Sequence, residues 1–365
     1  MLPPLKQKLR VAQICPLWEQ VPPKGYGGIE MIVHLLTEAL IHRGHRVTLF
    51  ASGDSHTHGN LVAPCDYALR HDPQARGDNL WRLNRKHVAL EQIQLKRLYE
   101  QAGEFDVIHS HLEMSALPFA ARSTTPTLHT LHMDLIPETC QILSQYGQQA
   151  FVSVSDAQRK PCPTLNYVGT VHNAIDLEAL PFFAKPQSPE YLAFLGRISP
   201  EKGIHHAIAI AQQIQIPLRI AGKFGQEDAD FFESVIKPEI DGQHIQYLGE
   251  ITQAEKIALL GQASVTLFPI TWNEPFGIVM IESMACGTPV LGMRMGAVPE
   301  VIQPGVSGLI CDSVEEMARQ VEIVRQFDRW RCREAVKARF SVERMVDAYE
   351  ACYARVLGLD PSDPT

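Results

Sequence analysis

The chain has 365 residues, a formal net charge of −8 at pH 7 and an apolar fraction of 45%. This length predicts two domains of ordinary size or one large one, each with a sizeable hydrophobic core. The acidic balance argues against nucleic acid as a partner, because contact with a phosphate backbone needs a basic surface.

Eight cysteines are scattered along the chain without a Cys-x-x-Cys pair. This pattern is typical of reduced, structural thiols and predicts a cytoplasmic location. The start of the chain lacks the pattern of a signal peptide, and no apolar segment approaches the roughly 18 residues of a membrane span. We therefore expect no transmembrane segment.

The first part of the chain alternates between strand and helix patterns. A buried strand over 11–15 leads through the glycine-rich segment 25–28 to a helix over 29–42 and a second strand over 46–51. This order predicts a parallel sheet. The glycine-rich segment is either a flexible connection or a loop whose backbone approaches a phosphate at the helix start.

A polar, turn-rich stretch over 52–80 precedes a long predicted helix over 81–101. The helix carries several Lys and Arg residues, and a solvated face explains them better than an anionic acceptor or a membrane surface. Further strands are predicted over 106–109, 126–131, 151–154 and 167–171. The first half is therefore a doubly wound α/β domain.

Histidines lie at or just beyond the predicted strand ends, where ligands bind in open parallel sheets. They are His109, His111, His129 and His132, and a second His-x-His pair stands at 56–58. Such pairs are compatible with a metal, but no cysteine or carboxylate set completes a site. Core or pocket histidines are the favoured interpretation.

The second half repeats the α/β alternation after a proline-bearing crossing over 180–190. We expect a first domain over 1–176 and a second over 177–344. The predicted strands of the second domain are 191–195, 217–221, 244–248 and 265–268, with helices over 204–214, 227–237 and 253–260. A last helix, about 345–360, is expected to return to the first domain.

The segment 273–300 is the centre of the prediction. A turn around Pro275 precedes a helical pattern that ends near Gly287, and a helix start of this kind offers unpaired N–H groups to an anion. On one continuous helix, Glu274 and Glu282 would lie about 12 Å apart along the axis and about 80° apart around it.

Taken together, these motifs resemble the retaining nucleotide-sugar glycosyltransferases of family 4, also called glycosyl transferases group 1. The resemblance spans nearly the whole chain: Gly27-Gly28, DVIHSH at 106–111, TLH at 130–132, VSVS at 152–155, NAID at 173–176, GRISPEKG at 196–203, the Glu274/Glu282 pair and GAVPEVI at 296–302. It implies the GT-B fold, with two Rossmann-like domains and a deep cleft between them.

The resemblance also implies roles for individual residues. Arg197 and Lys202 would stabilise the departing diphosphate, and arginine and lysine are suited to holding phosphate oxygens. Glu282 would bind the ribose, Glu274 a sugar hydroxyl, and His132 the donor sugar near the reacting carbon. The remaining donor-binding positions are Gly27, Gly28 and the backbone of Phe276, Gly277, Ile278 and Val279, while His109 is either on the acceptor side or in the core.

Two features stand outside this scheme. Asp228-Ala229-Asp230 has the Asp-x-Asp spacing that binds a metal in a different glycosyltransferase fold, but we interpret it here as a helix cap and expect no metal and no other cofactor. Arg294 lies in sequence beside the expected donor pocket, without an assigned role.

The sequence thus predicts a metal-independent, retaining transfer of a hexose from a nucleoside-diphosphate sugar, by default a UDP-sugar, to an acceptor hydroxyl. The implied mechanism is front-face substitution. A sugar-nucleotide epimerase, a phosphorylase and a non-catalytic sugar-nucleotide-binding protein are the alternatives. The acceptor is a sugar, glycan, lipid or small molecule, and a soluble acceptor is slightly favoured over peripheral membrane contact.

Overall fold

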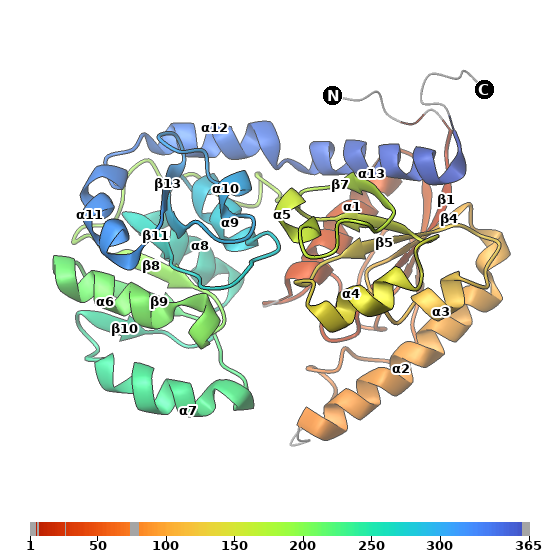
Figure 1. Ribbon diagram of the computed structural model, residues 1–365, viewed down its shortest axis with the longest axis horizontal. Helices are drawn as coiled ribbons and strands as arrows, with labels where there is room; N and C mark the ends of the chain where they lie inside the picture. The colour runs from red at the N-terminus through yellow and green to blue at the C-terminus, as the bar shows by residue number, and fades with distance from the viewer. Residues whose placement is uncertain (1–4, 6, 26, 74–79, 360–365) are drawn as a thin grey trace. The chain divides into compact units, whose positions relative to one another are not determined.

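The computed structural model describes residues 5, 7–25, 27–73 and 80–359. The chain divides into two compact units (Figure 1). Unit 1 consists of Met1–Ala174 and Val342–Thr365, and unit 2 is Ile175–Ser341. Each unit is built on a parallel sheet flanked by helices, which confirms the predicted α/β class.

The sheet of unit 1 has seven described strands in the order β3-β2-β1-β4-β5-β6-β7, and every adjacent pair is parallel. The strands are β1 (Arg10–Ile14), β2 (Arg46–Phe50), β3 (Asn60–Val62), β4 (Val107–Ser110), β5 (Thr127–Leu131), β6 (Ala150–Ser153) and β7 (Tyr167–Thr170). Strand β3 lies inside the stretch predicted to be polar loop. Three residues at a sheet edge are too few to show a period, so sequence patterning missed it.

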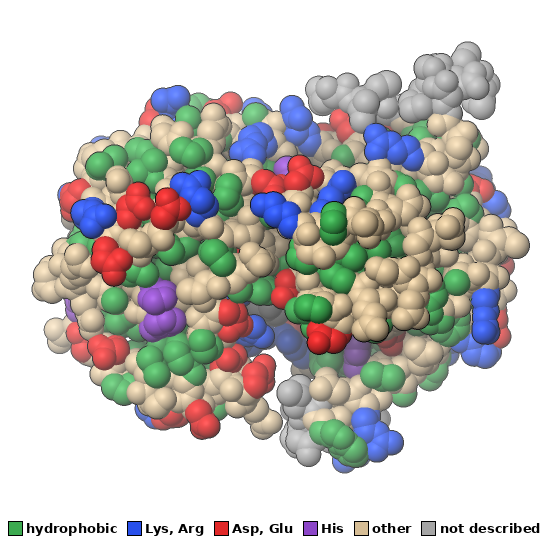
Figure 2. All heavy atoms as spheres, in the orientation of Figure 1, with side chains coloured by type: hydrophobic (Ala, Val, Ile, Leu, Met, Phe, Trp, Pro, Cys, Tyr) green, Lys and Arg blue, Asp and Glu red, His purple; other side chains and the backbone are tan. Residues whose placement is uncertain are grey.

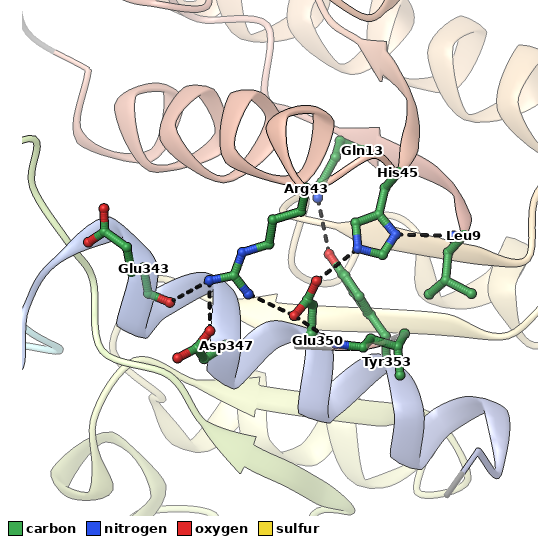
Figure 3. A network of polar contacts seen from close by, with 9 residues as sticks. Leu9, Gln13, Arg43, His45, Glu343, Asp347, Glu350 and Tyr353 are labelled. Carbon is green, nitrogen blue, oxygen red and sulfur yellow. Dashed lines mark hydrogen bonds and ion pairs between the residues drawn. The ribbon is translucent and has the colours of Figure 1, made fainter. Parts of the chain in front are cut away.

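The helices of unit 1 are α1 (Gly28–His42), α2 (Leu80–Glu100), α3 (Leu117–Ala120), α4 (Pro137–Ser144), α5 (Asp156–Arg159) and α13 (Val342–Leu357), with a 3-10 turn at Ala102–Glu104. Helix α13 packs against α1, β5 and β7. Tyr349 and Tyr353 on its inner face are completely buried. Glu350 of the same helix binds Arg43 and His45, which follow the end of α1 (Figure 3).

The sheet of unit 2 has six described strands in the order β10-β9-β8-β11-β12-β13, again all parallel. They are β8 (Leu192–Leu195), β9 (Leu218–Ala221), β10 (Ile245–Tyr247), β11 (Val265–Phe268), β12 (Val290–Met293) and β13 (Gly308–Cys311). Apolar residues of β8, β9 and β11 form the core of this unit with the inner face of α6, including Leu192, Ile220 and Ile208.

The helices of unit 2 are α6 (Ile204–Ile214), α7 (Ala229–Phe231), α8 (Gln253–Gln262), α9 (Ile278–Ala285), α10 (Val298–Val301), α11 (Val314–Val324) and α12 (Arg329–Arg339). The single helix predicted over 227–237 is instead a series of short segments: 3-10 turns at Gln226–Asp228 and Lys237–Glu239 enclose α7 and a π-helix at Phe232–Ile236. A further 3-10 turn at Pro200–Lys202 follows β8.

Strand order reverses at one place in each sheet. In unit 1 the chain runs outward in opposite directions from β1 and β4, and in unit 2 from β8 and β11. Ligands of open parallel sheets bind beyond the carboxyl ends of the strands at such a switch point. The loops that follow β1, β4, β8 and β11 are therefore the places where a site is expected.

Candidate active site

In unit 2 the loop after β8 lies directly against the segment after β11. Gly203 has a left-handed backbone with φ of 74°, and a Cβ atom there would lie 1.8 Å from the carbonyl oxygen of Pro269. The Thr271 N–H donates to the Glu201 carbonyl over 2.9 Å. Only glycine permits this approach, and it joins the GRISPEKG loop to the turn that carries Glu274.

Lys202 and Glu274, 72 positions apart in sequence, form an ion pair in this place. Lys202 Nζ is 2.6 Å from Glu274 Oε2, and the Trp272 indole N–H donates to the same oxygen over 3.0 Å. The Lys202 ammonium also lies 4.5 Å from the centre of the Trp272 ring, a cation–π distance. Glu274 is only 9% exposed, so the three side chains hold one another in a fixed arrangement.

Arg197 has a different partner. Its guanidinium is exposed and pairs with Glu201 one turn further along the loop. Burial raises the pKa of Asp228, while the positive charge of Arg197 opposes that rise. Asp228 is at the N-cap of α7 but makes no capping hydrogen bond through its side chain. The structure therefore places Asp228 at the predicted cap position, without a capping hydrogen bond from its side chain.

Helix α9 begins later than predicted. Its first residue is Ile278, and Gly277 before it is left-handed with φ of 83°. Glu274 therefore lies in the turn before the helix, and the continuous-helix geometry predicted for Glu274 and Glu282 is wrong. The turn is held from outside, because the Ala297 N–H donates to the Glu274 carbonyl over 2.9 Å.

The start of α9 keeps the features expected of an anion-binding position. No side chain caps it, and the first N–H groups of a helix have no partner within the helix. Ile278 and Val279 form this first turn, while the Phe276 ring is buried edge-on against Phe340 with centroids 5.7 Å apart.

Glu282 has a partner that sequence reasoning missed. Lys256 of α8 places its Nζ 2.5 Å from Glu282 Oε1. A capping box of Thr252 and Glu255 starts α8 directly before this lysine, a signal visible in the sequence. The pairing with Glu282 has no such signal, since the packing of two helices brings the residues together.

Arg294 is exposed and pairs with Asp312 through Nε, 2.6 Å from Oδ1. The structure thus gives this cation a partner at the carboxyl ends of β12 and β13. A ligand-directed role for Arg294 finds no support in this contact.

In unit 1 the loop after β1 leads into α1 through Gly27. This residue is buried with φ of 154°, and a Cβ atom would lie 2.6 Å from the Pro23 Cβ. Gly28 is exposed and is the first residue of α1. In the same turn, burial raises the pKa of Glu30 to about 7.

His132 follows β5 and is held from two sides. Its Nε2 is 2.9 Å from Nδ1 of His111, and its backbone N–H donates to Glu113 Oε1 over 3.3 Å. The N–H of Met133 donates to the same Glu113 oxygen over 2.8 Å. Burial lowers the pKa of His132 to about 4, so its imidazole is neutral at pH 7.

Glu113 is the second residue that sequence reasoning missed. It has a positive φ of 52°, which is unusual outside glycine, and burial raises the pKa of its carboxyl to about 6. A single glutamate in the loop after a strand carries no sequence signal of this conformation.

The other predicted histidines lie deeper. His109 is fully buried between Thr130 and Tyr353. Of the two alternatives predicted for this residue, the position in the core is therefore observed and the position on the acceptor side is not. His129 is also fully buried, and His58 pairs with Glu38 at 2.6 Å. Among the described residues, no group of three or more His, Cys, Asp or Glu side chains is arranged to hold a metal ion.

Charges are mixed over the described part of the surface seen in Figure 2, where Lys and Arg alternate with Asp and Glu. Within the residues that the structure describes, no helix has both the length and the apolar character needed to cross a membrane.

Two parallel Rossmann-like sheets, each with a switch point, define the GT-B class, and solved structures confirm this. AviGT4, a glycosyltransferase involved in avilamycin A biosynthesis, superimposes with a TM-score of 0.71 over 96% of this chain and 98% of its own, at 22% identity. Sucrose-phosphate synthase from Thermosynechococcus elongatus superimposes with a TM-score of 0.76 over 96% of this chain and all of its own, at 18% identity.

Two family models cover consecutive parts of the chain. Glycosyltransferase Family 4 matches residues 26–178, and Glycosyl transferases group 1 matches residues 178–329. The chain therefore belongs to the group 1 glycosyltransferases of family 4, enzymes that transfer a sugar from a nucleotide sugar.

Curated relatives agree with this assignment. The chain is 26% identical to a glycogen synthase of Mycobacterium tuberculosis over 347 residues, which is 80% of each chain. It is 27% identical to a phosphatidyl-myo-inositol mannosyltransferase of Mycolicibacterium smegmatis over 374 residues, covering 92% of this chain and 90% of that protein.

Proposed function

We propose that this enzyme transfers a hexose from a nucleoside-diphosphate sugar to an acceptor hydroxyl with retention of configuration and without a metal ion. A UDP-sugar is the proposed donor, supported by the fold shared with Anabaena Alr3699/HepE, whose structure contains UDP and glucose. The observation that carries the proposal is the cluster of Lys202, Trp272 and Glu274 beside the start of α9, at the switch point of unit 2.

The chemistry follows from the charge that develops during transfer. The bond between the anomeric carbon and the diphosphate oxygen breaks, and a bond to the acceptor oxygen forms on the same face of the sugar. The departing diphosphate accepts the proton of the acceptor hydroxyl. Arg197 and Lys202 stabilise its negative charge, aided by the N–H groups at the start of α9.

The geometry of Lys202 suits this role. An ammonium has three N–H donors, and Glu274 Oε2 together with the Trp272 ring fixes its position before a donor arrives. In this proposal His132 contacts the transferred sugar, Glu282 the ribose, and Gly28 the phosphates. The acceptor is a sugar, a polyol or a lipid headgroup, since all three present hydroxyl groups.

Lys202→Ala and Arg197→Ala test this proposal. Loss of a charge-stabilising donor of this kind lowers kcat by about 10²–10³. Lys237→Ala is the matched control, because Lys237 is an exposed lysine of unit 2 that pairs with Glu233 at 2.6 Å and belongs to no proposed site. Turnover is measured as nucleoside diphosphate released, and unchanged turnover in both site variants would contradict the proposal.

The alternatives separate in the same assay. A transferase releases nucleoside diphosphate in step with the acceptor added, whereas an epimerase converts one nucleotide sugar into another and needs no acceptor. A non-catalytic binder shows stabilisation by nucleoside diphosphates in a thermal-shift panel but no transfer. The anomeric configuration of the product, read by NMR, tests retention directly.

A further inference from the structure

A continuous row of buried polar side chains connects helix α13 with His132. Its members come from α13, β1, β4, β5 and the residues directly after β4 and β5: Tyr349, Tyr353, Thr130, His109, Gln13, His111 and His132. All except His132 are at most 1% exposed. A buried polar group without a partner is costly, so a row of this length demands a consistent set of donors and acceptors.

The sheet explains why these side chains meet. Strands β1, β4 and β5 are neighbours, and Gln13 lies opposite His109 in the register. Side chains alternate between the faces of a strand, so His109 and His111 share one face, as do Thr130 and His132. Helix α13 packs on β5 and brings Tyr349 and Tyr353 to this face.

The contacts form one unbranched path. His132 Nε2 lies 2.9 Å from His111 Nδ1, and His111 Nε2 lies 3.0 Å from Gln13 Oε1. The Gln13 amide nitrogen donates to the Tyr353 hydroxyl over 3.1 Å. That hydroxyl lies 2.8 Å from His109 Nδ1, and the path continues through Thr130 to Tyr349 at 2.7 and 3.2 Å.

The amide of Gln13 gives the path a direction. Burial holds the pKa of His109 and of His111 well below the ordinary value, so each ring is neutral and carries one N–H. Gln13 Oε1 can only accept, so His111 must donate from Nε2 and its Nδ1 must accept. His132 must therefore carry its proton on Nε2.

We propose that Gln13 and Tyr353 are positioning residues that fix His132 as the Nε2–H tautomer and present its Nδ1 lone pair as the acceptor for a hydroxyl of the transferred sugar. The link to the sugar rests on the proposed function of His132. The tautomer does not, because it follows from contacts within unit 1.

Tyr353 matters because its hydroxyl is the partner of the Gln13 amide nitrogen. With Gln13 Oε1 toward His111, this hydroxyl accepts from Gln13 and donates to His109. Without that hydroxyl the Gln13 nitrogen loses its partner, and a reversed amide would regain one by donating to His111 Nε2. His111 would donate from Nδ1 to His132, whose proton would move to Nδ1.

The experiment is nitrogen-15 NMR of the histidine rings in the full-length enzyme, which distinguishes protonated from unprotonated ring nitrogens. In the wild type, His109, His111 and His132 are each expected as the Nε2–H tautomer. An Nδ1–H tautomer for His132 would overturn the proposal without any variant being made.

Tyr353→Phe and Tyr349→Phe form a matched pair. Both remove one hydroxyl from a fully buried tyrosine of α13, but the Tyr349 hydroxyl contacts only the far end of the path, at Thr130. Tyr353→Phe is expected to give two tautomers of His132 and a kcat lowered about tenfold, the effect of one weakened hydrogen bond in the transition state. Tyr349→Phe is expected to keep one tautomer and near-normal kcat.

Two further measurements distinguish the ways in which the proposal could fail. The Kd for nucleoside diphosphate, whose proposed contacts other than Gly28 are in unit 2, stays unchanged in Tyr353→Phe, whereas general unfolding would weaken it. A single unchanged His132 tautomer in Tyr353→Phe would refute the positioning role. A mixed tautomer with unchanged kcat would instead refute the proposed contact of His132 with the sugar and leave the proton assignment standing.

Discussion

Replacing Glu350 by Gln is expected to loosen helix α13 from the rest of unit 1. The Glu350 carboxylate is 2% exposed and binds three donors (Figure 3): Arg43 at 2.7 Å, His45 Nε2 at 2.9 Å and the Leu5 N–H at 3.2 Å. His45 must donate from Nε2, because its Nδ1 accepts the Leu9 N–H over 3.1 Å. A glutamine of the same shape has one acceptor oxygen for these donors.

The magnitude follows from counting what glutamine leaves unpaired. Its oxygen can keep Arg43 and Leu5, which turns its NH₂ group toward the His45 N–H. Two buried donors then face each other, and each costs about 1–3 kcal/mol, so the expected loss is about 3 kcal/mol. Arg43 keeps Asp347 and the Glu343 carbonyl as partners, and this limits the damage.

The effect should depend on pH with a definite sign. Burial raises the pKa of Glu350, but hydrogen bonds from His45 and Leu5 and the charge of Arg43 outweigh it, so the folded pKa lies below the ordinary value of 4.5. A depressed carboxyl pKa gives stability that is present above the unfolded pKa and lost as pH falls through the folded one. The difference between wild type and Glu350→Gln should therefore shrink below about pH 4.5.

Thermal unfolding followed by circular dichroism tests this. At pH 7 the melting temperature of unit 1 should fall by roughly 6–12 °C for a loss of about 3 kcal/mol. Glu100→Gln is the control, since it makes the same chemical change in an exposed pair with Lys96 and should alter stability by less than about 0.5 kcal/mol. Equal melting temperatures for Glu350→Gln and wild type at pH 7 would refute the reasoning, as would a difference that stays constant down to pH 3.

Two other predictions concern unit 2 and the metal. Gly203→Ala should lower the free energy of unfolding of unit 2 by more than about 3 kcal/mol, because its Cβ would meet the Pro269 carbonyl at 1.8 Å. Gly242→Ala is the control, since Gly242 has a similar φ of 75° but open space around it, and it should cost only about 1–2 kcal/mol. Both values are measured by urea unfolding. Equal costs would contradict this. Transfer activity should survive dialysis against a chelator, and activity that vanished and returned with a divalent ion would disprove metal independence.

Much of the fold was predictable because parallel α/β units leave strong local signals. The helix predicted over 29–42 is observed as Gly28–His42, and the one predicted over 81–101 as Leu80–Glu100. In both segments apolar residues recur at regular helical spacing, which is the main sequence signal for a helix. Strand β3 and the π-helix at Phe232–Ile236 were missed, because three edge residues or one irregular turn have no period to detect.

The candidate site was less predictable in its geometry than in its composition. Motif spacing selected Lys202, Glu274 and Glu282, but the sequence favoured a helix running on from Pro275. The left-handed backbone of Gly277 prevents such a helix. The turn around Glu274 is stabilised by a hydrogen bond from Ala297, a residue more than 20 positions later in the sequence. Lys256 and Glu113 depend on tertiary packing alone, so no local pattern marked them.

The two glutamates share an arrangement that their sequence spacing does not show. Lys202 and Trp272 both contact Oε2 of Glu274, and Lys256 contacts Oε1 of Glu282. In each carboxylate these contacts are made to one oxygen, and none of them is made to the other oxygen. A carboxylate held in this way is already oriented before a ligand binds, so hydroxyl recognition need not displace the lysine. Glu274 therefore has two tasks in the proposed site: it holds the Lys202 ammonium in place for the diphosphate, and it offers its second oxygen to the sugar.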